Sequence, residues 1–332
     1  MRAQEVALAV EQPQLRVSIG GVVVPGATEM EIESVAYFAA DRFRINFVFG
    51  VTASTTVSYF LGLSLETLTI DVALSGFGYT TLLVGQVDNI QIDILQNRAI
   101  LTGRDLAARL IDTEVSETFV NQTASQIAVT IAQRHQLTPN VMATKTLTGQ
   151  YYQLDHARTV LAVNSRGTTE WNLLSTLASA ENFQLSVFGT VLNFGSPTQG
   201  VPLFLTAQDF IAVTFDMAAN LPGRAVVKSW NCRNKTMIMQ SNGTGLMTTL
   251  VRPNLTQEQA QALATSHLVT LGQHALVLLG TMPGDLVMMP GMQIQFGGTN
   301  SALDQNYTII EVSRTLDSNH GFLQRIRAYT AS

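Results

Sequence analysis

The chain has 332 residues, of which 46% are hydrophobic and only 13% are charged, whereas an average soluble domain has about 25% charged residues. Its 19 basic and 24 acidic side chains give a net charge of −5, which argues against the clustered basic surface of a nucleic-acid-binding protein. The single cysteine, Cys232, excludes an internal disulfide, and the sequence has no Cys/His cluster typical of a zinc site.

Two features of the sequence argue against export and membrane insertion. The start lacks the charged region, apolar core and cleavage site of a secretory signal. The most apolar stretch, residues 274–292, is interrupted by Gly280, Pro283 and Pro290, so it does not supply the roughly 18 uninterrupted apolar residues of a membrane helix. We therefore expect a soluble protein whose surface is covered by partners or solvated by neutral polar side chains.

The first hundred residues show the two-residue alternation of β-strands. Residues 15–19 alternate before Gly20-Gly21, which predicts a tight hairpin turn into 22–24. A second strand places four large apolar groups on one face: Phe43, Ile45, Phe47 and Phe49. Further strands are expected over 68–74, over 82–95 with a bend near Asp88-Asn89, and over 99–102, with a turn at 75–78. Several short strands of this kind predict a closed barrel or a sandwich.

From Gly103 onward the period becomes helical. Apolar residues at 106–107 and 110–111 fall at helical spacing, and a second helix begins at Thr123, where Gln126 completes a capping box. A third helix is expected over 169–180, and its apolar face consists of Trp171, Leu174, Leu177 and Ala178. A hairpin follows over 183–195 with its turn at Gly189. The middle of the chain is therefore predicted to be α+β.

Pro222-Gly223 marks the next boundary. Beyond it we expect a strand over 225–230, a glycine-rich turn at 242–245 and a helix opened by Thr256 with Gln259 as its box partner. Strands over 292–296, 307–314 and 322–329 end this region.

The order strand, turn, long strand, turn, strand occurs in residues 68–102 and again in 292–329. We interpret this repetition as a duplicated barrel-like unit. The predicted fold class is α+β, mainly β. Its domains are 1–104, a first barrel or sandwich; 105–222, an α+β middle region; and 223–332, a second barrel or sandwich with an inserted helix.

No pattern in the sequence predicts a catalytic, cofactor-binding or metal site. There is no nucleotide-binding loop, no His-Glu-x-x-His helix and no Gly-x-Ser-x-Gly elbow. His267 and His274 lie seven residues apart with no carboxylate between them, and Cys232 beside Trp230 is expected to be a small core residue. We therefore expect no enzyme, no cofactor and no metal.

Two other groups have both structural and functional interpretations. Four acids cluster around expected helix ends, where capping or helix-dipole roles explain them: Asp105, Asp112, Glu114 and Glu117. A pair of acids for glycoside cleavage stays open, because its members can be distant in sequence. A methionine-rich patch indicates either adaptable packing or a contact surface for a partner: Met282, Met288, Met289 and Met292.

Several segments resemble one family in the right order. Residues 103–112 (GRDLAARLID) look like the Gly-x-Asp-Leu motif that follows the first barrel in phage tail baseplate hub proteins of the late control protein D family. Residues 123–137 resemble that family's next helix. Residues 169–178, with Phe183, Gly189, Leu192 and Phe194-Gly195, resemble its helix and hairpin. Its second barrel is matched by 226–231, 290–292, Tyr307 and Gly321-Phe322.

The resemblance implies a homotrimeric hub related to the N-terminal part of type VI secretion spike proteins. In that family each subunit supplies two tube-like barrels, so that three subunits form a pseudo-sixfold ring between a sixfold tail tube and a threefold spike. The implied partners are the tail tube protein, a separate spike protein, other baseplate proteins and the tape-measure protein. The implied location is the tail baseplate of the virion, with assembly in the host bacterial cytoplasm, and DNA passes through the lumen only in transit.

Other functions stay open. One is a tail-associated peptidoglycan hydrolase, and another is the hub of a phage-derived or type VI-like injection particle. A saccharide-binding adhesion module would need exposed aromatic side chains, and only 7% of the residues are aromatic. If the chain is a ring subunit, its few charges should concentrate on loops and helix ends of the middle region, and both barrels should have large uncharged faces.

Overall fold

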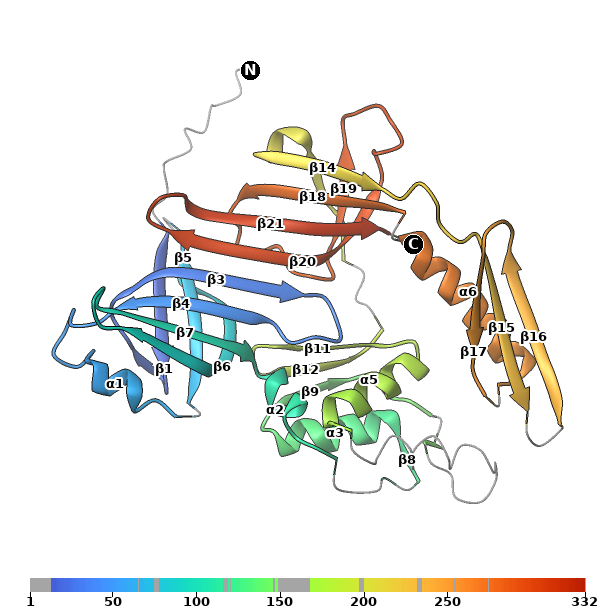
Figure 1. The fold of residues 1–332 in the computed structure, drawn as a ribbon, viewed down its shortest axis with the longest axis horizontal. Coiled ribbons are helices and arrows are strands. Elements are labelled where there is room, and N and C mark those ends of the chain that lie inside the picture. The colour runs from blue at the N-terminus through green and yellow to red at the C-terminus, as the bar shows by residue number, and fades with distance from the viewer. Residues whose placement is uncertain are drawn as a thin grey trace. The chain divides into compact units, whose positions relative to one another are not determined.

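The computed structural model describes residues 13–64, 66–74, 78–115, 119, 121–145, 147–148, 168–196, 200–231, 235–253, 255–273 and 275–331. The chain is mainly β and divides into two compact units. Unit 1 takes in Met1–Thr198, Met282–Pro290 and Glu311–Arg325, and unit 2 takes in Gln199–Thr281, Gly291–Ile310 and Ile326–Ser332 (Figure 1). The division of the chain into three domains stays a prediction.

Unit 1 begins with a curved sheet of antiparallel neighbours. Its strand order is β3-β4-β7-β6-β5-β1-β2. The elements are β1 (Gln14–Ile19), β2 (Val22–Val23), β3 (Ala27–Val35), β4 (Arg42–Val48), the short helix α1 (Val57–Leu61), β5 (Thr67–Ala73), β6 (Thr80–Asp93) and β7 (Arg98–Asp105). The second half of β20 (Asn306–Asp317) pairs with β3 on the other side, Glu311 opposite Val35 and Leu316 opposite Met30.

Sequence alternation accounts for the core of this sheet. Phe43, Ile45 and Phe47 of β4 are buried together with Leu68 and Ile70 of β5, as predicted. The Gly20-Gly21 hairpin turn is confirmed, with both glycines at positive φ, and the register of β6 against β7 shifts between Val87 and Asn89, which confirms the predicted bend. The predicted turn at 75–78 lies largely outside the described residues.

Of the two architectures predicted, a closed barrel or a sandwich, the closed barrel is not formed by the described residues. Strand pairing in unit 1 runs as an open path that ends at β2, and no ladder joins β1 to β3. The sheet nevertheless curls, because β1 approaches β3 and the Val24 amide donates to the Val17 carbonyl at 2.9 Å. β2 is only two residues long, and the path of paired strands ends there without the pairing that would close a barrel.

The helical part of unit 1 has its own core. It contains α2 (Ala107–Ile111), β8 (Gln122–Thr123), α3 (Ala124–Arg134), β9 (Thr138–Val141), β10 (Leu147–Thr148), α5 (Glu170–Ala180), β11 (Gln184–Phe188) and β12 (Val191–Gly195). The capping box of Thr123 and Gln126 and the buried face of α5 are confirmed. Thr169 caps α5 by accepting from the Asn172 amide. The parallel pairing of β9 with β12 was not predicted.

Unit 2 contains a second curved sheet. Its elements are β13 (Leu203–Thr206), the 3₁₀ helix η1 (Ala207–Asp209), β14 (Ala212–Met217), β18 (Leu276–Pro283), β19 (Gln293–Gly297), β20 and β21 (Gly321–Thr330). The unit boundary divides β18, β20 and β21. Phe215 of β14 packs against Phe296 and Tyr307, with ring centroids 5.1 and 6.0 Å apart, so the aromatic core lies under β14, β19 and β20.

The two sheets share one strand order. Taken in chain order, β1, β3, β4, β5, β6 and β7 correspond to β13, β14, β18, β19, β20 and β21. In space the first sheet has the order β3-β4-β7-β6-β5-β1 and the second has the order β14-β18-β21-β20-β19-β13. Each strand of the first sheet therefore has the same neighbours as its counterpart in the second. One pairing differs in direction, because β13 is parallel to β19 whereas β1 is antiparallel to β5. The predicted duplication is therefore present in the topology.

The largest difference between the sheets is an insertion. The connection from β3 to β4 is short, whereas residues 218–275 between β14 and β18 form β15 (Arg224–Asn231), β16 (Thr236–Gly243), β17 (Met247–Val251) and α6 (Gln257–Gln273). The strand order is β16-β15-β17. Thr256 and Gln259 form the predicted capping box of α6. This small sheet and α6 enclose their own core, including Ala225, Val227, Ala260 and Ala264.

The expectation about charge is wrong for the first sheet. The exposed side of β3 and β4 has two oppositely charged pairs in register, Glu31 opposite Arg44 and Glu33 opposite Arg42. Opposite charges facing each other across antiparallel strands stabilise the pairing and keep that face solvated. Charges are therefore not confined to the middle region.

Candidate functional site

The motif Gly103–Asp112 lies where the first sheet of unit 1 leads into its helices. Gly103 opposes Val87 of β6, and a Cβ atom at Gly103 would lie 2.0 Å from the Gln86 carbonyl oxygen. Gly85 faces the same constraint, since its Cβ would lie 2.3 Å from the Arg104 carbonyl oxygen. The two strands approach each other so closely that only glycine fits at both positions.

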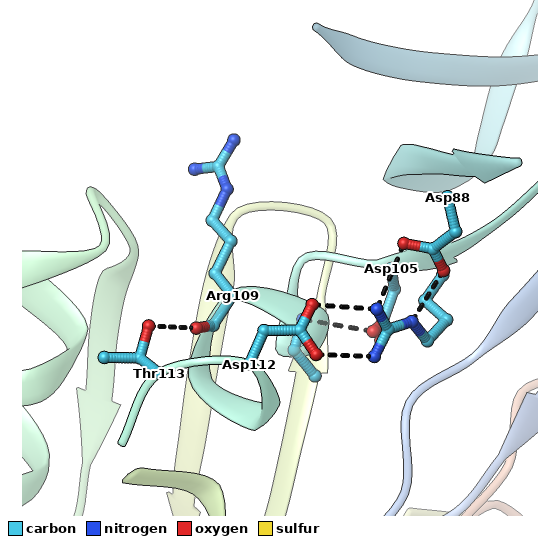
Figure 2. Close-up of polar contacts among 7 residues, drawn as sticks. Asp88, Asp105, Arg109, Asp112 and Thr113 are labelled. Atoms are coloured by element: carbon cyan, nitrogen blue, oxygen red, sulfur yellow. Dashed lines mark hydrogen bonds and ion pairs between the residues drawn. The ribbon is translucent and has the colours of Figure 1, made fainter. Parts of the chain in front are cut away.

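Arg104 connects three parts of the structure. Its Nε and Nη2 donate to Asp88 of β6 at 2.6 and 3.0 Å, and its Nη1 and Nη2 donate to Asp112 after α2 at 3.1 and 2.8 Å. In Figure 2 dashed lines run from Asp88 and Asp112 to the same guanidinium. The hydrogen bonds that Arg104 donates to the two carboxylates, those to Asp88 first, raise the pKa of Arg104 above its usual range. The motif arginine thus fixes α2 to the sheet.

Asp105 faces the interior and is 4% exposed. Its Oδ1 accepts a hydrogen bond from the Ala107 amide at 3.0 Å, and its own amide donates to the Asp41 carbonyl at 3.0 Å. Burial raises the pKa of Asp105 well above its ordinary value, and the nearby Asp41 raises it further. The N-cap of α2 is Leu106, which makes no side-chain cap hydrogen bond, and Asp105 binds the first helical amide from the position before that cap.

Asp41 belongs to the same buried polar group. Its Oδ1 accepts from the Val35 amide at 2.9 Å, and burial raises its pKa to about 6, against the stabilising effect of Arg314. Arg314 of β20 is 1% exposed; its Nε donates to the Asp285 carbonyl at 3.0 Å and its Nη2 donates to the Met288 carbonyl. Burial also lowers the pKa of Arg314. Within unit 1 these side chains join the motif to β20 and the 284–290 loop.

The remainder of the motif binds the helices together. Leu106, Ala107 and Leu110 are buried in the helical core. Arg109 donates from Nη1 to the His135 carbonyl at 3.2 Å, and its own carbonyl accepts from the Thr113 hydroxyl at 2.7 Å (Figure 2).

A second ion pair, in which the glutamate is buried, joins α5 to the end of α3. Glu170, the first residue of α5, is 1% exposed, and its carboxylate binds the Arg134 guanidinium and His135 Nε2. Sequence reasoning did not find this role for Glu170, because its partners lie 35 and 36 residues away.

The structure also places most of the other acids, methionines and histidines that the sequence analysis named. Asp112 lies at the C-terminal end of α2, where the helix dipole disfavours a negative charge, so a favourable interaction with the dipole is wrong for this residue. Its carboxylate instead accepts hydrogen bonds from Arg104. Glu114 forms an isolated bridge with Thr169. Met282 and Met288 are buried, which favours packing for these two. His320 contacts Asp317, and His267 is half-buried. Glu117, His156, Cys232 and His274 lie outside the described residues.

Across the described ranges, no group of three His, Cys, Asp or Glu side chains that could hold a metal ion was found. Nor does any helix in those ranges have the length and apolar character needed to cross a membrane.

One surface hollow is lined by three acids, and two of them, Glu29 and Asp317, have hydrogen-bond partners within the fold. It includes Glu29, Glu31 and Asp317 together with Arg44 and Arg98. The Glu29 carboxylate binds Arg98 at 2.9 Å and also the Asn46 amide. Asp317 accepts from the backbone amides of Asn319 and His320, and the His320 amide is the main cause of its lowered pKa. A glycosidase acid needs the opposite, a raised pKa.

Comparison with known proteins supports a fold but no sequence family. No protein-family model and no curated protein matches the chain. The tail protein from Neisseria meningitidis MC58 superimposes with a TM-score of 0.73 at 14% identity over 96% of both chains. The 43 kDa tail protein of prophage MuSo2 from Shewanella oneidensis gives 0.72 at 17% identity, over 95% of this chain and 98% of the other.

A third similar structure comes from a secretion system. The E. coli c3393 protein, described as a component of the type VI secretion system with structural similarity to the T4 bacteriophage tail proteins gp27 and gp5, gives a TM-score of 0.59 at 13% identity. The match covers 95% of this chain and 77% of that one. The chain therefore has the fold of phage tail proteins, a fold shared with a type VI secretion component.

Proposed function

We propose that the chain is a structural subunit of a phage tail baseplate, namely the hub that connects the tail tube to the central spike. The observation that carries this proposal is the duplicated strand order of the two curved sheets. A chain with two equivalent sheets offers six equivalent units when three copies form a ring. Such a ring matches a sixfold tube on one side and a threefold spike on the other.

In this role the subunit acts mechanically. The homotrimer binds the tail tube protein, a separate spike protein and other baseplate proteins, and the tape-measure protein reaches it from the tube. When the spike leaves, the ring opens a path for DNA ejection. The net charge of −5 suits a lumen that DNA crosses without binding, because a basic wall would hold the phosphates. The subunit is assembled in the host bacterial cytoplasm and resides in the virion tail.

The buried acids support a non-enzymatic role. Asp41 and Asp105 have raised pKa values, which is a property of catalytic acids, but both side chains accept hydrogen bonds from backbone amides within the fold. In the surface hollow, Glu29 binds arginine and Asp317 binds backbone amides. We therefore infer that the chain does not hydrolyse peptidoglycan. Release of soluble fragments from purified peptidoglycan by the isolated protein would contradict this.

One observation favours a second candidate, the hub of a type VI-like injection particle. The fold shared with c3393 is compatible with it, since that protein is described as a type VI secretion component. Both candidates require the same ring. Nuclease-protected DNA in purified particles that contain the chain would identify a phage, and particles without DNA would identify an injection particle.

The first test of the proposed function is the oligomeric state. One chain has a mass of 36.0 kDa, so three copies give about 108 kDa. Sedimentation of the purified protein over a range of concentrations, alone and with the tail tube protein, is expected to reveal the trimer. A monomer under every one of these conditions would contradict the trimeric hub.

A further inference from the structure

The small sheet inserted between β14 and β18 has two different faces. On one face α6 packs against β15 and β16 (Figure 1). Ala225 and Val227 lie in the core that α6 covers. The other face presents five large apolar side chains, each between 49% and 67% exposed: Trp230, Met237, Met239, Met247 and Val251. Exposed apolar patches of this extent on a folded protein mark interaction surfaces.

Strand register places these five side chains together. Trp230 of β15 lies opposite Met237 of β16, and Lys228 lies between Met239 of β16 and Val251 of β17. Arg224 lies opposite Met247. Residues that face each other across strands point to the same side of a sheet. Arg224 and Lys228, both exposed, therefore lie among the apolar groups, and we call this surface the cationic face.

The size of the cationic face suits a stable protein interface. At these exposures each large apolar side chain presents about 100 Å², so that five give about 500 Å². A standard interface buries about 800 Å² on each partner, of which about 60% is apolar. The cationic face thus offers roughly the apolar area of one side of such an interface.

The same unit contains a segment of opposite charge. From β13 through η1 to the edge strand β14, four large apolar side chains are exposed: Leu203, Phe204, Ile211 and Met217. Met217 lies on the same side of β14 as Phe215. Two acids, Asp209 of η1 and Asp216 of β14, are exposed on the same segment. Phe215 points into the aromatic core, so its strand neighbour Asp216 points outward. We call residues 203–217 the acidic edge.

We propose that the cationic face of one copy docks on the acidic edge of the next copy in the ring. A cyclic assembly with more than two members uses a heterologous contact, in which each chain contributes two different surfaces. The cationic face and the acidic edge are two such surfaces, both apolar and with opposite charges. This inference rests on the proposed function, because it names the partner of this surface as a second copy of the chain.

A charge swap tests the pairing. Lys228→Glu and Asp216→Lys are each expected to weaken self-association about tenfold, because each places like charges in the contact. The double variant Lys228→Glu/Asp216→Lys is expected to restore it. Sedimentation across a concentration series measures the dissociation constant, and thermal unfolding at low concentration, where the protein is monomeric, verifies that the variants fold. Two weakened single variants without restoration in the double variant would overturn the pairing.

An apolar variant tests the face itself. Met239→Glu places a carboxylate opposite Lys228, so it removes apolar area and offsets positive charge in the contact, and it is expected to weaken association about 100-fold. Leu95→Glu is the matched control, because it adds the same charge at an apolar position that is 96% exposed in the β6–β7 turn. A trimer that resists Met239→Glu as well as Leu95→Glu overturns this inference and leaves the trimeric hub intact. A wild-type protein that does not self-associate under any of these conditions would instead contradict the proposed trimeric hub.

Discussion

The guanidinium of Arg104 binds the carboxylate of Asp88 through two hydrogen bonds, Nε–Oδ2 at 2.6 Å and Nη2–Oδ1 at 3.0 Å. Asp112 takes the remaining side of the same guanidinium. A planar guanidinium can satisfy two carboxylates in this way, which a lysine ammonium cannot do. The motif residue therefore sets the position of α2 relative to the strands that precede it.

Replacement of Arg104 is expected to loosen that connection. Arg104→Met should lower the free energy of unfolding by about 1–2 kcal/mol, because the interaction is bidentate at both acids but partly exposed. Arg98→Met is the control: Arg98 forms a single ion pair with Glu29, and both side chains are about one third or more exposed. Its loss should cost less than about 1 kcal/mol. Denaturant unfolding measures the stability of both variants. Equal losses of unfolding free energy would contradict the role of Arg104 in joining α2 to the sheet.

Gly103 is expected to tolerate no side chain. Gly103→Ala would place a Cβ 2.0 Å from the Gln86 carbonyl oxygen and 2.6 Å from the Phe43 ring, so the two strands must separate. We expect a loss of about 3 kcal/mol or more, seen as a lower melting temperature or as insoluble protein. Gly272→Ala in α6, where the new methyl meets nothing within 4 Å, should be neutral or stabilising by up to about 1 kcal/mol. Unchanged stability of Gly103→Ala would refute the close approach.

Stability should depend on pH through Asp41. Its folded-state pKa of about 6 lies above the ordinary 3.8, so between these values the folded protein holds a proton that the unfolded chain has released. Stability therefore falls as pH rises from about 4 to 6, by about 3 kcal/mol for this group. The raised pKa of Asp105 acts in the same direction. Below about pH 4, Asp304 and Asp317, whose pKa values are lowered, lose their contributions.

The measurement is denaturant unfolding between pH 4.5 and 7.5. Asp41→Asn is expected to flatten the profile and to raise stability at pH 7, because the side-chain oxygen still accepts from the Val35 amide but no longer ionises. Asp93→Asn serves as the control, since that carboxylate accepts amides in an exposed turn. A pH profile that is unchanged by Asp41→Asn would refute the assignment.

Local signals in the sequence predicted local structure well. The capping boxes at Thr123 and Thr256 and the alternation of 43–49 require only neighbouring residues, and the structure confirms them. The repeated strand pattern also predicted the duplication. The elements that were not predicted from the sequence depend on distant partners. β9 is a four-residue strand that includes Pro139, and it forms only because it pairs with β12 more than fifty residues later.

In the candidate site, too, contacts between sequence neighbours could be predicted and contacts between distant residues could not. The position of Asp105 at a helix end could be predicted because its partner, Ala107, is two residues away. The partners of Arg104 and Glu170 could not be assigned, since the ion pairs form only when sheet and helices meet. The sequence predicted either a closed barrel or a sandwich, because strand periodicity does not specify how the two ends of a sheet meet.

The central claim is that three copies of the chain place six equivalent sheets in one ring. Electron cryomicroscopy of the assembled particle, averaged with threefold symmetry, tests it most directly. We expect a ring of three chains at the end of the tail tube, in which the sheet of β1 and β3–β7 alternates with the sheet of β13, β14 and β18–β21 around the axis. A baseplate in which the chain is peripheral, or in which the sheets do not alternate around a common axis, would contradict the hub.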